Sequence, residues 1–199
     1  FFVGYDVPAK VEGLKLTATE YEATLTWSAP TGGAEGGAIR GPISYEVVRM
    51  PGNVVVAESQ PATSFSETLT VPALYSYIVT AITPDGRGVS TQSNAMVVAN
   101  FGVPYSESFN TADAAGLYSI IDNNNDGKTW DYDEDGQRMR YTYGVKSAGD
   151  DWLISPGIRL EKGKSYAFAF NVSKEMNSYT ETMEVYYGAS SDVKSMTKI

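Results

Sequence analysis

The residues best suited to chemistry lie in one acidic stretch, "DNNNDGKTWDYDEDG", which runs from residue 122 to residue 136. It contains six acidic side chains and one lysine. Carboxylate and amide oxygens at alternate positions, followed by a glycine that permits a sharp turn, are the donors that Ca²⁺ prefers. The pattern D-x-[DN]-x-[DN]-G occurs twice in this stretch, at Asp122, Asn124, Asp126 and Gly127, and again at Asp131, Asp133, Asp135 and Gly136.

Two interpretations of the acidic stretch stay open. It has a net charge of −5, and its carboxylates repel one another where they lie within a Debye length of about 8 Å. This repulsion favours a bound cation. The alternative is a solvated turn, because Asn, Asp and Gly all tolerate positive φ. An EF-hand is not expected, since the twelfth position counted from Asp122 is Asp133 rather than Glu and no amphipathic helix flanks the loop. We therefore expect one structural Ca²⁺ held with help from remote ligands, or a bare turn.

The composition argues against most catalytic chemistry. The chain contains no Cys and no His, so no disulfide, thiolate nucleophile, imidazole zinc ligand or Ser-His triad can form. Glycosidases need two carboxylates about 5 to 9.5 Å apart, whereas Asp150–Asp151 and Glu134–Asp135 are sequence neighbours that point to opposite faces of a strand. The sequence predicts a protein that is not an enzyme.

The charge distribution also limits the partners. The net charge is −9 and no basic stripe is present, which argues against nucleic acid and against anionic membranes. No apolar run reaches the roughly 18 residues of a membrane span, so membrane insertion is not expected.

Short strands separated by turns must position these residues. Over the first hundred residues the apolar and polar residues alternate in seven runs, with turn residues about every 8–12 positions. This pattern predicts strands over residues 14–20, 23–30, 43–50, 53–59, 63–71, 74–83 and 90–99. An all-β, immunoglobulin-like sandwich is the fold class predicted.

The quoted runs "ATLTWSAP", "ISYEVVRM" and "YSYIVTAITPDGRGVSTQSN" make residues 8–99 resemble a fibronectin type III domain. The resemblance implies a core Trp27 on the second strand, Tyr45 on the third, and Tyr77 at the tyrosine corner. The chain departs from that family in the long Gly-rich segment at residues 31–42. Residues 1–7 read as the end of a preceding domain or as a linker.

The second half, residues 100–199, follows the linker "VVANFGVP" and resembles the jelly-roll domains of bacterial surface proteins called cleaved-adhesin or choice-of-anchor domains, which are similar to galactose-binding and MAM-like sandwiches. The motifs "SESFN", "IIDNNNDGKTW" and "DDWLISPGIRLEKGKSYAFAF" carry the resemblance. Such domains are longer, so we expect an incomplete domain cut from a longer chain. The alternation in "YAFAFNV" predicts a strand with Tyr166, Phe168 and Phe170 on one face, in a hairpin with "DDWLISPGIRL".

This second resemblance implies a structural Ca²⁺ and brings remote ligands near the acidic stretch. The expected ligand set is Asp122, Asn124, Asp126, Glu107 and Asp151, with Asp150 as an alternative to Asp151. The implied function is a non-catalytic adhesion or spacer module of an exported, multidomain bacterial surface protein. Its partner would be a glycan or a protein on a host or neighbouring cell, beside neighbouring domains of the same chain. A carbohydrate-binding accessory module of a secreted hydrolase is the alternative.

Overall fold

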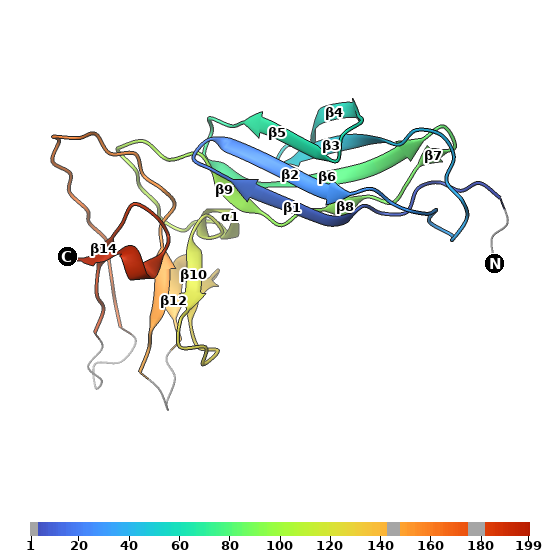
Figure 1. The fold of residues 1–199 in the computed structure, drawn as a ribbon. Helices are drawn as coiled ribbons and strands as arrows, with labels where there is room; N and C mark the ends of the chain where they lie inside the picture. Colours follow the sequence, from blue (N-terminus) through green and yellow to red (C-terminus); the bar gives the residue numbers. More distant parts are fainter. Residues whose placement is uncertain (1–3, 143–147, 175–181) are drawn as a thin grey trace. The chain divides into compact units, whose positions relative to one another are not determined.

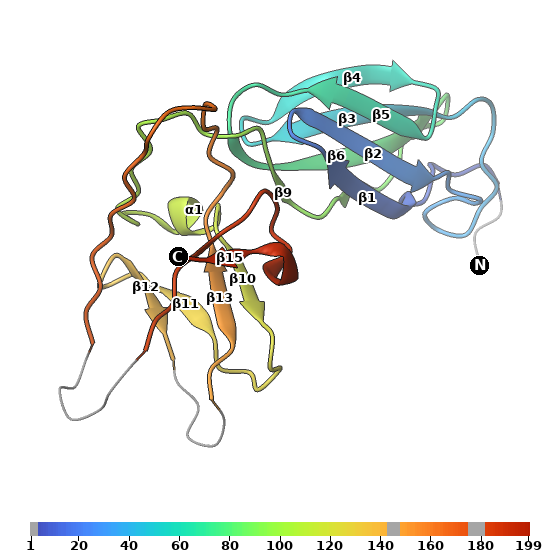
Figure 2. The same cartoon turned by 60° about the vertical axis from the view of Figure 1, so that its left-hand side comes forward.

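The structure is a computed structural model that describes residues 4–142, 148–174 and 182–199 (Figures 1 and 2). The chain divides into two compact units, Phe1–Asn100 and Phe101–Ile199, so the division falls within "VVANFGVP". Apart from one α-helical turn and one 3-10 turn, the regular elements of the described residues are β-strands. The all-β prediction is therefore confirmed.

Unit 1 is a sandwich of two antiparallel sheets. One sheet has the order β1-β2-β5, and the other has the order β4-β3-β6-β7, with β8 and β9 also pairing with β6. This is the strand arrangement that the fibronectin type III resemblance predicts. The strands are β1 (Glu12–Ala18), β2 (Glu22–Ser28), β3 (Ser44–Met50), β4 (Val54–Gln60), β5 (Ser64–Thr68), β6 (Ala73–Thr83), β7 (Gly86–Arg87), β8 (Thr91–Gln92) and β9 (Met96–Val98).

The core of unit 1 follows the alternation of its strands, because successive side chains of a strand point to opposite faces. Leu25 and Trp27 of β2 are buried, and so are Tyr45 and Val47 of β3. The rings of Trp27 and Tyr45 meet edge to face across the two sheets, with centroids 5.2 Å apart. The predicted core roles of both aromatic residues are confirmed.

The tyrosine corner is formed by Tyr75, and the prediction of Tyr77 is wrong. The Tyr75 hydroxyl donates to the Val71 carbonyl oxygen at 2.7 Å, which fixes the turn that enters β6. Tyr75 and Tyr77 lie on the same face of β6, so alternation alone does not distinguish them. Only Tyr75, near the first residue of the strand, is close enough to this turn.

Tyr77 instead joins a polar cluster that connects the two sheets. Its hydroxyl donates to Glu67 Oε1 of β5 at 2.8 Å, and Arg49 Nη1 of β3 contacts Glu67 Oε2 at 2.5 Å. Burial raises the pKa of Tyr77 far above its usual value, and the hydrogen bond to the Glu67 carboxylate adds to the effect. This cluster ties the sheets together at the site where they carry polar side chains inward.

The Gly-rich segment, where the chain departs from its family pattern, is organised by a buried carboxylate. Asp6 is only 7% exposed. Its Oδ2 accepts the backbone N–H of Glu35 at 2.6 Å and that of Gly37 at 3.4 Å. A Cβ on Gly33 would lie 2.4 Å from the Asp6 side chain, so glycine is needed there for close approach. By these contacts Asp6 belongs to unit 1.

Unit 2 contains short antiparallel pairs rather than one continuous sheet. Among its described residues, β10 pairs with β13, β11 with β12 and β14 with β15. No helix in the described residues is long and apolar enough to cross a membrane. The elements are α1 (Ala112–Ala115), β10 (Ser119–Asp122), β11 (Trp130–Asp133), β12 (Arg138–Tyr141), β13 (Asp151–Ile154), β14 (Tyr186–Tyr187), a 3-10 turn (Val193–Ser195) and β15 (Thr197–Lys198).

Two strand predictions for unit 2 are wrong. Residues 165–174 belong to no strand of the described structure, although their alternation suits one. The "DDWLISPGIRL" segment forms β13, but β13 pairs with β10 rather than with the segment after the 161–164 turn. The physical reason is that alternation sets which face a side chain occupies, whereas a strand also needs a hydrogen-bonding partner, and no described strand pairs with residues 165–174.

Candidate cation and ligand site

The candidate site is built on the β10–β13 pair. In its register Asp122 lies directly opposite Asp151, and Ile121 lies opposite Trp152. The pairing continues one step further, because the Asn123 N–H donates to the Asp150 carbonyl oxygen at 3.0 Å. Since side chains alternate along both strands, Asp122 and Asp151 share one face, which we call the Tyr141 face. Asn123, Asp150 and Trp152 share the other, the Trp152 face.

The Tyr141 face holds two like charges against an aromatic wall. The Tyr141 hydroxyl donates to Asp151 Oδ2 at 3.0 Å, and the Trp130 indole N–H donates to the Asp151 carbonyl oxygen at 3.3 Å. The rings of Trp130 and Tyr141, from β11 and β12, lie 5.5 Å apart. Asp151 Oδ1 is buried and has no hydrogen-bond partner within the described residues. Like charges directly opposite each other destabilise an antiparallel pair.

The pKa of Tyr141 is raised, first by burial and then by the neighbouring carboxylates. Burial raises it to about 12, helped by the hydrogen bond to Asp151 and by the charges of Asp126 and Asp122. All three carboxylates therefore lie close enough to disfavour a phenolate at this position.

The loop between β10 and β11 is folded by its own side chains. The Asp122 carboxylate accepts the backbone N–H groups of Asp126 at 3.2 Å and Gly127 at 2.9 Å. Asn124 Nδ2 donates to the Ala148 carbonyl oxygen at 2.9 Å. Gly127 has a φ of +74°, the left-handed conformation that glycine adopts most easily. The first acidic repeat is thus a closed loop with its carboxylates gathered at one end.

The predicted ligands are brought together only in part. Asp122, Asn124 and Asp126 share the loop, and Asp151 lies opposite Asp122. Glu107 is used elsewhere, since its Oε1 accepts the Phe109 N–H at 2.5 Å, and no described contact connects it to the loop. Within the residues that the structure describes, no three acidic side chains converge closely enough to hold a metal ion.

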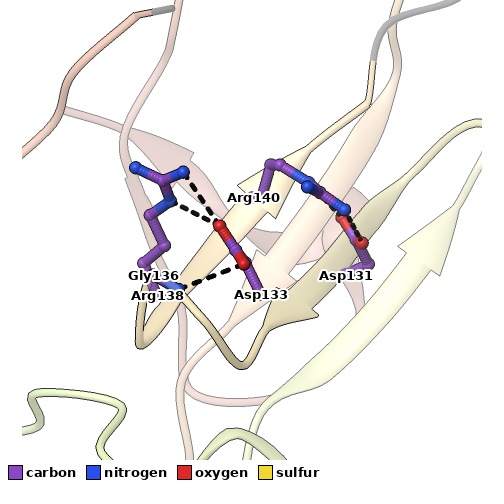
Figure 3. Close-up of polar contacts among 5 residues, drawn as sticks. All are labelled: Asp131, Asp133, Gly136, Arg138 and Arg140. Carbon is purple, nitrogen blue, oxygen red and sulfur yellow. Dashed lines mark hydrogen bonds and ion pairs between the residues drawn. The ribbon is translucent and has the colours of Figure 1, made fainter.

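The second acidic repeat has a different structure (Figure 3). Asp131 and Asp133 lie on β11, opposite Arg140 and Arg138 of β12. Arg140 Nη2 contacts Asp131 Oδ2 at 2.6 Å, and Arg138 Nη2 contacts Asp133 Oδ2 at 2.8 Å. The expectation that all the charges of the stretch are uncompensated is therefore wrong for these two residues. Their cations come from the next strand, just beyond the acidic stretch itself.

The turn of this hairpin also uses Asp133. The backbone N–H of Gly136 donates to Asp133 Oδ1 at 3.2 Å, and this bond together with the Arg138 guanidinium lowers the pKa of Asp133. The second repeat is accordingly a strand and a hairpin turn, not a cation loop.

The Trp152 face carries a set of residues that sequence reasoning mostly missed. Trp152 Nε1 donates to Asp150 Oδ1 at 3.0 Å, and Asn123 Nδ2 donates to Asp150 Oδ2 at 2.5 Å. The Trp152 ring packs on Tyr186 of β14, with centroids 4.8 Å apart. The dipeptide Asp150–Asp151 was the available signal, because consecutive acids on a strand must point to opposite faces. Asp150 orients the Trp152 indole and the Asn123 amide, whereas the Asp151 side chain lies on the Tyr141 face.

The comparisons with known proteins concern the fold. No protein-family model matches the chain, and no curated protein matches it significantly. Similar solved structures include titin kinase with its flanking domains, at 20% identity over 47% of this chain and 17% of that one, with a TM-score of 0.40. They also include FN3tt, at 14% identity over 47% of this chain and 96% of that one, with a TM-score of 0.37.

A third similar structure is the fibronectin type III domain of human fibronectin type III domain containing protein 3. Its identity is 20% over 52% of this chain and 97% of that one, with a TM-score of 0.37. At this level of similarity, the description of unit 1 as fibronectin type III-like rests on its strand order and its tyrosine corner.

Proposed function

We propose that this chain is a non-catalytic, extracellular adhesion and spacer module of an exported bacterial surface protein. Unit 1 is the spacer, a closely packed sandwich that holds its neighbours at a distance. Unit 2 is an adhesion domain of jelly-roll type, and the β10–β13 pair is its ligand-binding element. Among the described residues, Asp131 and Asp133 are paired with arginines. Asp151 accepts a hydrogen bond from a tyrosine hydroxyl, and Asp122 accepts one from a backbone N–H group. That pattern supports a structural use of the carboxylates rather than a catalytic one.

A structural Ca²⁺ on the Tyr141 face is part of the proposal. The observation that carries it is the pair of facing carboxylates, Asp122 and Asp151, with the Asp151 Oδ1 buried and unpartnered among the described residues. Oxygen atoms of this kind are the ligands of hard cations. Asp126 and the amide oxygen of Asn124 would complete the donor set from the loop. A bound Ca²⁺ would supply positive charge between carboxylates that otherwise repel each other.

The two faces of the pair explain how a cation would affect a ligand. Asp122 and Asp151 alternate along their strands with Asn123 and Asp150, so fixing one face orders the other. An ordered Trp152 face loses less conformational entropy when it binds a partner, which increases affinity without any new contact.

The decisive experiment measures thermal unfolding of the full chain with Ca²⁺ and with chelator. A ligand present at a hundred times its Kd stabilises the folded state by about 2.7 kcal/mol. We expect the unfolding transition of unit 2 to rise with Ca²⁺ and to fall with chelator, while that of unit 1 stays in place. A melting curve that is identical under both conditions would remove Ca²⁺ from the proposal.

The second candidate function is a carbohydrate-binding accessory module of a secreted hydrolase. It is favoured by the packed rings of Trp152 and Tyr186 beside the side chains of Asn123 and Asp150. Aromatic surface next to hydrogen-bonding groups suits a sugar face. A glycan array separates the two functions: a specific sugar bound by the chain and lost in Trp152→Ala supports this candidate. Binding of protein partners without any sugar supports the adhesion module.

A further inference from the structure

A second surface of unit 2 exposes aromatic side chains along residues 165–172. The bulky residues occupy alternate positions, and the exposed fractions are 41% for Tyr166, 69% for Phe168, 48% for Phe170 and 69% for Val172. The rings of Phe168 and Phe170 lie 5.3 Å apart, so these two side chains share one side of an extended backbone. Large apolar side chains gathered on a surface in this way mark an interaction site more often than isolated ones do.

Tyr166, Phe168 and Phe170 form one wall of an open groove of about 580 Å³. The other wall comes from residues 182–185, Lys198 and Ile199, and it combines apolar with polar and charged side chains. In Figure 2 the first wall belongs to the orange extended segment that leads down to a grey trace, and the red segment beyond that trace returns toward β15. Residues 165–172 are in no ladder with any described strand, whereas Val185 continues the β14–β15 pair by accepting the Ile199 N–H at 2.9 Å. The backbone of residues 165–172 has donors and acceptors to offer a partner.

The groove has positive charge at one end. Residues 161–172 contain two lysines and one glutamate, a net charge of +1 in a chain of −9. The Glu161 N–H donates to the Tyr166 hydroxyl at 2.8 Å, which holds the 161–164 turn against the first wall. This turn carries the exposed Lys162 and Lys164. On the opposite wall the charges of Lys198 and Glu184 offset each other, so the positive charge beside the groove is that of the lysines in the turn that bonds to Tyr166.

We propose that this groove binds an extended acidic peptide strand in which apolar and acidic residues alternate. The peptide adds as a β-strand along residues 165–172, and its backbone pairs with theirs. Its apolar side chains pack against Phe168 and Phe170, and its carboxylates approach Lys162 and Lys164. A second copy of this chain is disfavoured as the occupant, because a two-fold contact would place the same positive segment against itself.

The proposal goes beyond the cation and ligand site and does not depend on it, since the two surfaces share no residue. Chelator should therefore leave peptide binding unchanged even if it lowers the melting temperature of unit 2. Failure of the Ca²⁺ proposal and failure of this proposal are thus separate results.

The test uses fluorescein-labelled seven-residue peptides and the full chain, with anisotropy as the readout. We expect a peptide of alternating Val and Glu to bind, and one of alternating Val and Lys to bind at least about tenfold more weakly. A Val/Glu peptide N-methylated on all its amides should also lose binding, because it cannot donate to a strand from either edge. The variants Phe168→Ser and Phe170→Ser should each weaken binding by about tenfold, a change of about 1.4 kcal/mol.

Matched controls separate the groove from general stickiness. Val71 of unit 1 is 66% exposed, so Val71→Ser removes an exposed apolar side chain of similar accessibility and should change nothing. The double change Lys162→Glu with Lys164→Glu should reverse the preference toward the Lys peptide.

Three results would overturn the proposal. They are equal binding of the acidic and basic peptides, equal binding of the N-methylated peptide, and absence of binding at millimolar peptide. Sedimentation velocity that shows a concentration-dependent dimer, abolished by Phe168→Ser, would assign the groove to a second copy instead and would also overturn it.

Discussion

The two acidic repeats of unit 2 have the same spacing of oxygen donors but different structures. The first, Asp122 to Gly127, is a loop whose carboxylates bind its own backbone and face Asp151 across the β10–β13 pair. The second, Asp131 to Gly136, is a strand and a hairpin turn whose carboxylates face arginines. In the first repeat Asp122 lies opposite another acid, whereas in the second repeat Asp131 and Asp133 lie opposite arginines.

The difference teaches that a ligand-spacing motif is defined by what lies opposite it. The residue across from Asp122 is an acid, and the residue across from Asp131 is Arg140. Opposite-charge pairs stabilise an antiparallel sheet, whereas like-charge pairs weaken it. The same D-x-[DN]-x-[DN]-G pattern thus gives a candidate cation site in one register and a closed hairpin in the other.

The strongest way to break the comparison is to neutralise one acid in each repeat. With Ca²⁺ present, we expect Asp151→Asn to lose the whole stabilisation by the ion, about 2.7 kcal/mol at a hundredfold excess over Kd. With chelator the sign reverses, because the substituted amide removes one of two facing like charges while its oxygen still accepts from the Tyr141 hydroxyl.

The matched variant is Asp131→Asn, measured by thermal unfolding in the same two conditions. It should keep the full response to Ca²⁺. A response that both variants lose, or that both keep, would contradict the assignment of the ion to the first repeat.

A second comparison uses the glycines that end the two repeats. Gly127 has a φ of +74°, so Gly127→Ala places a Cβ in the left-handed region at a cost of about 1–2 kcal/mol. Gly136→Ala meets instead the side chains of Asp133 and Arg138, at 2.6 and 2.7 Å. Those side chains can move aside, so the cost should be smaller. Urea unfolding measures the free energy of unfolding of the two variants. A larger loss for Gly136→Ala than for Gly127→Ala would contradict this prediction.

A third prediction concerns the exposed ion pair of the hairpin. Arg140→Gln should destabilise by about 0.2–1 kcal/mol, the range of surface salt bridges, because both side chains of this pair are about half exposed. The loss should shrink at high salt and be the same with Ca²⁺ and with chelator. Denaturation at low and high ionic strength tests this, and a Ca²⁺-dependent loss would link the hairpin to the cation site.

The smallest expected effect is a change in the pKa of one carboxyl group, that of Asp133. The Gly136 N–H and Arg138 hold the pKa of Asp133 below its usual value. A carboxyl group with a lowered folded-state pKa contributes stability above its unfolded-state pKa, and this is lost as pH falls through the folded-state value. Arg138→Gln should therefore raise the pKa of Asp133 toward normal and cost stability only at pH values above it. Carboxyl NMR titration of wild type and variant measures both changes.

Prediction from the sequence succeeded where local pattern is enough. Alternation and turn residues were sufficient for β1 to β6, because burial of one face fixes the register of a half-buried strand, and the family resemblance placed Trp27 and Tyr45 in the core. The run 90–99, predicted as one strand, is instead divided into β8 and β9, and the short β7 was not predicted. The same pattern failed to choose between Tyr75 and Tyr77, which share a face. It also predicted a strand for residues 165–174. Their side chains alternate, but they pair with no described strand.

By itself, the sequence determined the all-β class, the absence of Cys and His chemistry, and the presence of two groups of closely spaced oxygen donors. Only the tertiary structure decided which carboxylates meet a positive charge. Asp131 and Asp133 pair with arginines that follow the acidic stretch. Asp122 lies opposite Asp151, which is 29 positions further along the chain. The physical reason is that electrostatic energy depends on distance in space, and strand register brings together charges that sequence spacing keeps apart.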